Sequence, residues 1–581
     1  MKITKDKTEQ LQNDLYDTLD VVVLGVDINV ITMALQATVP GQELYVIGPP
    51  DELTKVHEAF DKNKRVHCCP VDVDEDGEHS VLSAFQKHLL RMAIHAHHKC
   101  HVKFLLFDES LYPDMDDYLI VFSDKTHVDE KWLDKNDYYQ SLQATLTEWI
   151  DLYAMFAWTG IAHSKEMLAQ HIINTPRICK TYDYNQFKFH GPIVLCLSGP
   201  SLMEAKELIK IATQRKAYVV CAGTAYIALR KYNIMPDAIC VIDSFEENDA
   251  HYLHLDVPET IAFWFGPKVR YTVPEYFDGH VQYWHDDMSR YLKHAIGKDV
   301  IPEIRRCGSV VHAMLQLAML AEPSSIYLCG SDLALTGGKS HVAGGSHQSS
   351  TYDEDGADIK TVACVDGGMV CTTNLLDGYR FGVEEILSLA SNVPPVYNVS
   401  QGAAIKGTTH MSLDDALFQF EQDVRKQYRK VSPAVKSKDR MINTRNNLNK
   451  ILAKTIDMAE AFEKAVAIML KFDLVNNDEL NKDEVVALNR AVGKIGYEHS
   501  EVVAELVNDY DQNGAARRIF NDNLLNVIGQ KEVDKKVKLV SNIARDIDSY
   551  AASVSSCRAL ASLIRQALAQ MQTDYSYRPK F

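Results

Sequence analysis

The chain has 581 residues, of which 46% are hydrophobic and 24% are charged, an ordinary balance for a globular protein. This length predicts two to four domains. The net charge of −18 argues against a general nucleic-acid binder and against a protein that docks on anionic lipid, because both need clustered Lys and Arg.

The N-terminal segment, residues 1–17, is polar and charged and has no apolar signal core. No run of about 18 apolar residues occurs, so no membrane span is predicted. The twelve cysteines include no CxxC pair, and no metal site is predicted. Some of them, such as Cys196 and Cys329, fall in predicted strands, where a reduced thiol behaves as a small buried hydrophobe. A cytoplasmic protein with reduced thiols is therefore expected.

Residues 1–180 are predicted to form an N-terminal α/β domain that ends in a helical linker. Its apolar runs predict strands at 21–25, 44–48, 102–108 and 119–122, and a helix at 28–38. Gly25 follows the first strand, but the pattern GxGxxG is absent. Dinucleotide binding is therefore not supported.

A second domain, residues 181–410, begins with a buried strand at 193–198, the turn Ser198-Gly199-Pro200-Ser201 and a helix at 202–215. Ser201 and Glu204 have the spacing of a capping box at the helix start. A Gly turn before a helix N-terminus offers backbone N–H groups and a positive dipole end, which favours a phosphate. The alternative is that Gly and Ser serve the turn geometry alone.

The second domain continues as an alternation of strands, turns and helices. Strands are predicted at 217–222, 238–242, 261–265, 281–284 and 326–330, and helices at 225–232 and 310–320. This order predicts a mostly parallel sheet with helices on both faces, a Rossmann-like α/β fold. Ligands bind beyond the carboxyl ends of such strands. The residues expected there are Gly223, Thr224, Asp243, Gly308, Ser309, Gly330 and Asp332.

Two histidines, His341 and His347, flank a Gly-rich loop just past the strand at 326–330. Imidazole titrates near neutral pH, so these side chains are candidates for a general acid or base, although a lone histidine is usually structural. Lys339 is either a partner for a phosphate or a plain surface lysine. Gly338-Lys339-Ser340 is not the end of a P-loop, because residue 333 is Leu where a Gly is required.

The remaining residues, 411–581, are predicted to be an all-helical C-terminal domain. Apolar residues recur at spacings of three and four from Leu448 to Met469 and again from Val533 to Val554. Long amphipathic helices suit either a groove for a partner or the interface of a homo-oligomer. Nothing in this part indicates catalysis.

The central motifs resemble the motility-associated factor (Maf) flagellin glycosyltransferases, which are related to the family 42 sialyltransferases and to archaeal pterin diphosphokinase-like proteins. The turn Ser198–Ser201 and the segment Cys307-Gly308-Ser309 resemble the two nucleotide-binding segments of the sialyltransferases. The remaining matches are short motifs in the same order, namely Gly223-Thr224-Ala225, Pro236-Asp237 with Asp243, Gly330 to Ala334, His341 to Gly345 and Gly402 to Gly407. Cys307-Gly308-Ser309 departs from the Thr-Ser-Gly of the sialyltransferases, so its hydroxyl contact is not assigned.

The resemblance implies transfer of a nonulosonic acid, such as pseudaminic or legionaminic acid, from a CMP-activated donor to Ser or Thr of flagellin. It implies that Ser198, Gly199, Pro200 and Ser201 bind the donor together with a further set. That set is Gly223, Thr224, Asp243, Gly308, Ser309, Gly330 and Lys339. His341, Asp332 and His347 are the expected catalytic residues. No cofactor is required, because CMP carries one phosphate, and Mg²⁺ is an optional partner.

Two other functions stay open. The first is an ATP-dependent pterin diphosphokinase-like enzyme, which would bind ATP with Mg²⁺ through the same turn. The second is a non-catalytic assembly factor whose helical domain binds flagellin.

Overall fold

The computed structural model describes, apart from a few isolated positions, the following residues: 11–15, 18–38, 42–71, 102–107, 119–123, 162–179, 187–215, 217–244, 257–266, 268–277, 281–283, 285–286, 290–297, 303–305, 307–345, 359–424, 430–431, 438–471, 501–511 and 535–573. Contacts divide the chain into two compact units. One contains 1–163 with 462–494 and 511–552, and the other contains 164–461 with 495–510 and 553–581. The three domain ranges expected from the sequence stay a prediction.

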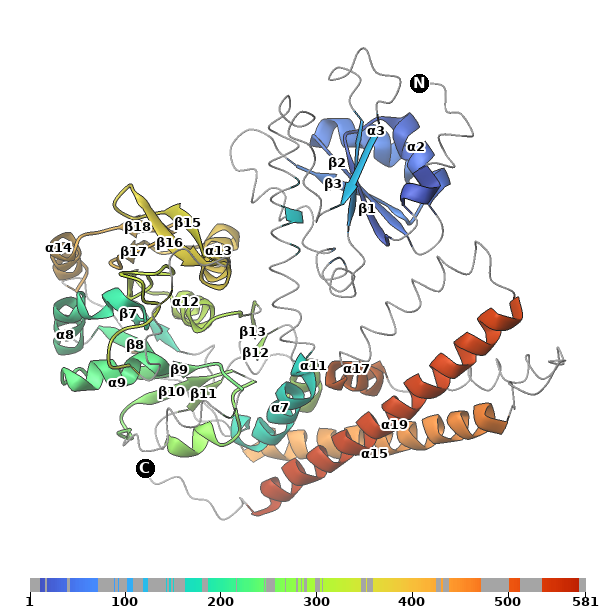
Figure 1. Cartoon of the computed structure of the whole chain (residues 1–581). Coiled ribbons are helices and arrows are strands. Elements are labelled where there is room, and N and C mark those ends of the chain that lie inside the picture. Colours follow the sequence, from blue (N-terminus) through green and yellow to red (C-terminus); the bar gives the residue numbers. More distant parts are fainter. Residues whose placement is uncertain are drawn as a thin grey trace, which may run out of the picture. The chain divides into compact units, whose positions relative to one another are not determined.

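The first unit contains a sheet with the order β3-β2-β1-β4-β5 (Figure 1). Its strands are β1 (Asp20–Leu24), β2 (Glu43–Gly48), β3 (Val66–Pro70), β4 (Lys103–Phe107) and β5 (Leu119–Ser123). All pairs are parallel except β4 with β5. The sequence predicted four of these strands and the helix α2 (Ile28–Ala37), but not β3 or the helix α3 (Pro50–Phe60).

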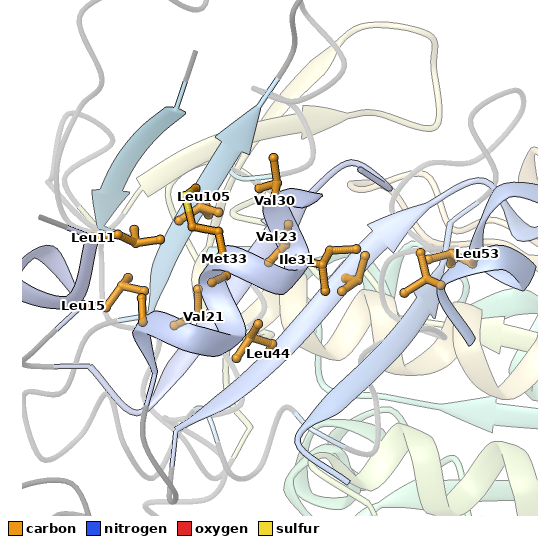
Figure 2. Packing of buried hydrophobic residues seen from close by; sticks show 14 residues of the cluster. Leu11, Leu15, Val21, Val23, Val30, Ile31, Met33, Leu44, Leu53 and Leu105 are labelled. Carbon is orange, nitrogen blue, oxygen red and sulfur yellow. The ribbon is translucent and has the colours of Figure 1, made fainter. Parts of the chain in front are cut away.

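The core of this sheet lies under α2, as Figure 2 shows. Val21 and Val23 of β1 and Leu44 of β2 point toward Ile31 and Met33 of α2, and all five are buried. Asp27 caps the helix, because its Oδ1 accepts hydrogen bonds from the N–H groups of Asn29 and Val30. All residues of β1 are buried, as expected for an apolar run, and its alternate residues Val21 and Val23 form the face that meets α2.

The second unit holds a parallel sheet with the order β11-β10-β9-β8-β7-β14-β17-β18 among the described residues. Its strands are β7 (Pro192–Cys196), β8 (Tyr218–Ala222), β9 (Ala238–Val241), β10 (Ala262–Phe265), β11 (Val281–Tyr283), β14 (Ser325–Cys329), β17 (Val396–Asn398) and β18 (Thr409–His410). The predicted parallel Rossmann-like sheet is confirmed. The thiols of Cys196, Cys221, Cys240 and Cys329 are buried within it, and burial raises the pKa of each.

Helices pack on both faces of this sheet, as predicted (Figure 1). α8 (Lys206–Gln214) and α9 (Gly223–Lys231) follow β7 and β8, and right-handed crossovers place them on one face. α12 (Val310–Leu320) and α13 (Asn374–Leu389) pack against each other on the opposite face, where the chain runs back to β14 and β17. α14 (Leu413–Val424) contacts α8 and β7.

Smaller elements complete the described parts of the chain. They are α7 (Ser164–Ile178), α11 (Arg290–Ala295), the hairpin of β15 (Ile359–Ala363) and β16 (Met369–Thr373), and the pairs β12 (His285–Asp286) with β13 (Glu303–Ile304) and β6 (Lys188–Phe189) with β19 (Lys430–Val431). The C-terminal helices are α15 (Lys438–Lys471), α17 (Glu501–Tyr510) and α19 (Lys535–Thr573). Among the described residues of the tail, helices predominate, as the sequence predicts, and the two residues of β19 pair with β6.

Asp423 of α14 fastens this helix to the start of β14. Its Oδ2 accepts hydrogen bonds from the hydroxyls of Ser325 (2.6 Å) and Tyr327 (2.8 Å), and its Oδ1 accepts one from Gln419 (3.1 Å). We expect Asp423→Ala to lower the free energy of unfolding by about 3 kcal/mol, because two buried hydroxyls lose their acceptor. Urea denaturation measures this, with Asp414→Ala on the exposed side of α14 as the control. A loss no larger than that of the control would contradict the structural role of Asp423.

Candidate functional site

The strand order of the second unit reverses between β7 and β14. From β7 the chain adds β8, β9, β10 and β11 on one side, and from β14 it adds β17 and β18 on the other. Such a reversal separates the loops that follow the two central strands, and ligands bind at this point in open α/β sheets. The segments that meet here are the turn 198–201 after β7 and the segment 330–333 after β14. We call these two segments the switch-point loops.

Asp332 connects the switch-point loops. Its Oδ2 accepts a hydrogen bond of 3.0 Å from the backbone N–H of Ser201, although the two residues are 131 positions apart in sequence. Ser201 Oγ in turn accepts a hydrogen bond of 3.2 Å from the N–H of Gln401 in the loop after β17. The ends of β7, β14 and β17 are therefore joined through one buried carboxylate and one buried hydroxyl.

The turn after β7 differs from the sequence prediction. Residues Pro200–Met203 form a 3₁₀ turn and α8 begins only at Lys206. The predicted capping box of Ser201 and Glu204 does not form, because the Ser201 hydroxyl bonds to Gln401 and the N–H of Glu204 donates to the Ser201 carbonyl oxygen. The carboxylate of Asp332 takes the place of a capping side chain at this helix start.

The Asp332 carboxyl is 1% exposed, and its Oδ1 has no hydrogen-bond donor among the described residues. Burial raises the pKa of this carboxyl from 3.8 to about 7, against the lowering effect of the hydrogen bonds from Ser201. The catalytic role expected for Asp332 from the sequence stays a prediction. In the structure this carboxyl caps the turn after β7, and a pKa near 7 is also suited to proton transfer.

Two glycines allow the switch-point loops to approach each other. A Cβ at Gly199 would lie 2.1 Å from Asp332 Oδ2 and 2.5 Å from the carbonyl oxygen of Gly330. Gly330 has a φ of +72°, and a Cβ there would lie 2.5 Å from the carbonyl oxygen of Leu197. The Gly199 N–H also donates a hydrogen bond of 2.8 Å to the Gly330 carbonyl oxygen. Both glycines are therefore required by close backbone approach.

Hydroxyl groups from two neighbouring strand ends meet beside this point. Thr224 Oγ1 donates a hydrogen bond of 3.0 Å to Ser198 Oγ, so the turn after β7 and the start of α9 are in contact. The N–H of Val342 donates a hydrogen bond of 2.8 Å to the Ser198 carbonyl oxygen. A Cβ at Gly345 would lie 3.1 Å from the Thr224 carbonyl oxygen. The Gly-rich loop 341–345 thus lies against Ser198 and Thr224, as a loop over a ligand site would.

The predicted proton carriers and the basic residue lie on or next to this loop. His341 is partly buried, and its Nδ1 lies 2.9 Å from Ser340 Oγ. Lys339 is exposed, and its backbone closes a two-residue turn with Thr336 around Gly337 and Gly338, both with positive φ. His347 lies outside the described residues, and its role stays a prediction.

Asp243 follows β9 and the turn Gly308-Ser309 precedes α12, and their place in the site stays a prediction. The carbonyl oxygen of Asp243 accepts a hydrogen bond of 3.2 Å from the N–H of Arg270. Burial raises the pKa of Tyr379 to about 12, and the charge of Asp243 adds to this shift. Gly308 and Ser309 directly precede α12, which packs under β7, β8 and β9.

Sequence reasoning missed two parts of this site. The first part is the loop after β17, which contacts both switch-point loops. Ser400 Oγ accepts a hydrogen bond of 2.6 Å from the N–H of Ser331, and the N–H of Gln401 donates one to Ser201 Oγ. His312 on α12 was also missed, although the spacing of Ser309 and His312 is that of a capping box with a histidine in place of Glu or Gln. That spacing is the signal that could have revealed it.

No group of three His, Cys, Asp or Glu side chains that could hold a metal ion occurs within the described parts of the chain. None of the described helices has the length and apolar character needed to cross a membrane.

Comparisons with known proteins found two similarities. Residues 169–338 match the family described as 6-hydroxymethylpterin diphosphokinase MptE-like. This confirms the predicted relation to pterin diphosphokinase-like proteins for the part of the chain that contains the switch-point loops. A solved structure, that of a Maf glycosyltransferase from Magnetospirillum magneticum AMB-1, is 13% identical, with 99% of this chain and 85% of that chain covered and a TM-score of 0.49. No curated protein sequence matches the chain.

Proposed function

We propose that the protein is a glycosyltransferase that moves a nonulosonic acid from a CMP-activated donor to Ser or Thr hydroxyls of flagellin. The observation that carries the proposal is the meeting of the Ser198 and Thr224 hydroxyls, the Gly199 turn and the Gly-rich loop with His341 at one reversal of strand order. Sites of this geometry bind nucleotides in open α/β sheets. The motifs of the Maf glycosyltransferases fall on the same residues.

A CMP-activated donor suits this set of side chains because it carries one phosphate. Hydroxyls such as those of Ser198 and Thr224, together with a helix start, can bind a single phosphate without a metal ion. We therefore propose that the transfer needs no Mg²⁺. We also propose that it takes place in the cytoplasm.

The proposed transfer breaks the bond between the sugar and the CMP phosphate and forms a bond between the sugar and the acceptor oxygen. The transition state has the oxocarbenium character usual for glycosyl transfer. His341 takes the proton of the acceptor hydroxyl, and CMP leaves as the phosphate anion. The loop 341–345 positions this histidine because Val342 is bonded to Ser198.

One observation favours a second candidate. The matched family at residues 169–338 is described as 6-hydroxymethylpterin diphosphokinase MptE-like. A kinase of this kind would bind ATP with Mg²⁺ at the same strand ends and transfer a diphosphate instead of a sugar.

Thermal unfolding in the presence of nucleotides separates the candidates. A nucleotide at about 100 times its Kd stabilises a protein by about 2.7 kcal/mol, which raises the Tm by a few degrees, roughly 2–4 °C. We expect CMP to raise the Tm and UDP to leave it unchanged. A rise with ATP and Mg²⁺ but not with CMP would favour the kinase. No rise with any nucleotide, together with binding of flagellin, would favour a non-catalytic assembly factor.

Transfer itself is measured by mass spectrometry of purified flagellin after incubation with the protein and a CMP-nonulosonic acid. We expect His341→Gln to lower the rate by about 100-fold or more while CMP still raises the Tm. His190→Gln is the matched control, since His190 is exposed and precedes β7, at the strand end away from the site. Transfer that survives EDTA supports a metal-free reaction. Equal rates for His341→Gln and the control would remove His341 from the mechanism.

A further inference from the structure

His312 is the third residue of α12 and lies in its first turn. It is 4% exposed, and its imidazole is hydrogen-bonded on both sides. Nδ1 lies 3.2 Å from the backbone nitrogen of Gly308 and 3.2 Å from that of Ser309. Nε2 lies 2.9 Å from the carbonyl oxygen of Tyr379 on α13. Two N–H donors at Nδ1 require a lone pair there, so the ring proton sits on Nε2 and donates to Tyr379.

The packing around the ring leaves this arrangement little freedom. A Cβ at Gly382 would lie 2.4 Å from His312 Nε2, so α13 approaches the imidazole at a glycine. Burial lowers the pKa of His312 to about 4, against the raising effect of the hydrogen bond to Tyr379. The neutral ring therefore persists at physiological pH, and Nδ1 stays an acceptor for the turn.

The bonds to His312 decide which groups of the turn remain for another molecule. The N–H groups of Gly308 and Ser309 are used by the imidazole. The N–H groups of Val310 and Val311, the first two of α12, have no acceptor in the parts of the chain that the structure describes. These N–H groups lie at the positive end of the helix dipole, where an anion binds favourably.

The same imidazole also links the turn to Tyr379, and the charge of Asp243 adds to the raised pKa of that phenol. One side chain thus joins the Gly308-Ser309 turn at the start of α12 to Tyr379 on α13. These two segments are far apart in the chain, and His312 is the group that the hydrogen bonds share.

We propose that His312 is a positioning residue for the nucleotide of the donor. It holds the Gly308-Ser309 turn and Tyr379 in one arrangement, so that the Ser309 hydroxyl and the N–H groups of Val310 and Val311 are set for the nucleotide. This inference rests on the proposed function, because the nucleotide is the CMP part of the donor. His312 itself does not touch the reacting atoms.

The test uses two substitutions in the full chain. His312→Phe keeps a ring of similar size and removes all three hydrogen bonds. His312→Gln keeps an acceptor and a donor and restores the usual capping-box residue at this helix position. Hydrogen–deuterium exchange of the peptide that contains Gly308 and Ser309 measures the turn in the free protein, and calorimetry measures the Kd for CMP.

We expect His312→Phe to speed exchange of this peptide by about tenfold or more and to raise the Kd for CMP by about tenfold. We expect His312→Gln to restore both values to within about threefold of the wild type. Exchange of the peptides of β10 and β14, which belong to the same unit as His312, serves as the internal control for folding. The turnover number for transfer should change less than the KM for the donor, because His312 acts on binding.

Faster exchange without any change in the Kd for CMP would overturn the inference and leave His312 a structural residue. Unchanged exchange in both variants would overturn it as well. Failure of the proposed function has a different result: the wild-type protein then binds no CMP, whereas the exchange data still decide whether His312 holds the turn. In that case the assignment to the CMP donor is rejected, and the hydrogen bonds to the turn are judged by exchange alone.

Discussion

Gly199→Ala is expected to abolish CMP binding and to lower the free energy of unfolding by about 2–3 kcal/mol. The added Cβ would lie 2.1 Å from Asp332 Oδ2 and 2.5 Å from the Gly330 carbonyl oxygen, so the switch-point loops must move apart. Overpacking of this kind costs about 1–3 kcal/mol. The movement also stretches the hydrogen bond from Gly199 N–H to Gly330 and that from Ser201 N–H to Asp332. Urea denaturation and calorimetry with CMP measure the two effects.

Gly368→Ala is the matched control for this substitution. Gly368 is exposed in the turn between β15 and β16, and its Cβ would approach only the side-chain oxygen of Asp366, at 3.3 Å. That side chain is also exposed and can move away. Equal affinity of the two variants for CMP would mean that nucleotide binding does not depend on the geometry of the turn after β7.

Asp332→Asn is expected to make the protein more stable at pH 8 and to remove part of its pH dependence. The folded-state pKa of this carboxyl, about 7, lies above the ordinary 3.8, so the folded chain binds the proton more tightly than the unfolded chain. The contribution of this carboxyl to the free energy of unfolding is fully present below about pH 4 and is lost as the pH rises to 7. We expect the difference in unfolding free energy between variant and wild type to change by about 2–3 kcal/mol between pH 5 and pH 8.

Asp414→Asn, on the exposed surface of α14, is the control for the change from carboxylate to amide. It should show no such dependence on pH. A constant difference between Asp332→Asn and wild type across this range would mean that the buried carboxyl is not held in its neutral form. The variant also separates two roles, because Asn can still accept the hydrogen bond from the Ser201 N–H. Loss of transfer with CMP binding retained would assign Asp332 the catalytic role expected from the sequence.

Most of the sheet elements could be predicted because their signals are local. The apolar runs 193–198, 217–222 and 326–330 match β7, β8 and β14 to within two residues at each end, and the helix expected at 310–320 is α12. The helix expected at 202–215 instead begins with a 3₁₀ turn. This error has a specific cause: the residue that caps the helix start is Asp332, which no local pattern around Ser201 could indicate.

The sequence by itself determined the order of strands and helices, the parallel character of the central sheet and the set of turns at its carboxyl ends. These follow from hydrophobic periodicity and from the position of Gly, Ser and Asp after each strand. Only the tertiary structure decided how the turns are connected. It joins Asp332 to Ser201, Gln401 to Ser201 and His312 to Tyr379, which are pairs far apart in the chain. Such contacts depend on the reversal of strand order between β7 and β14 and on packing of α12 against α13, and neither is encoded in any single stretch of residues.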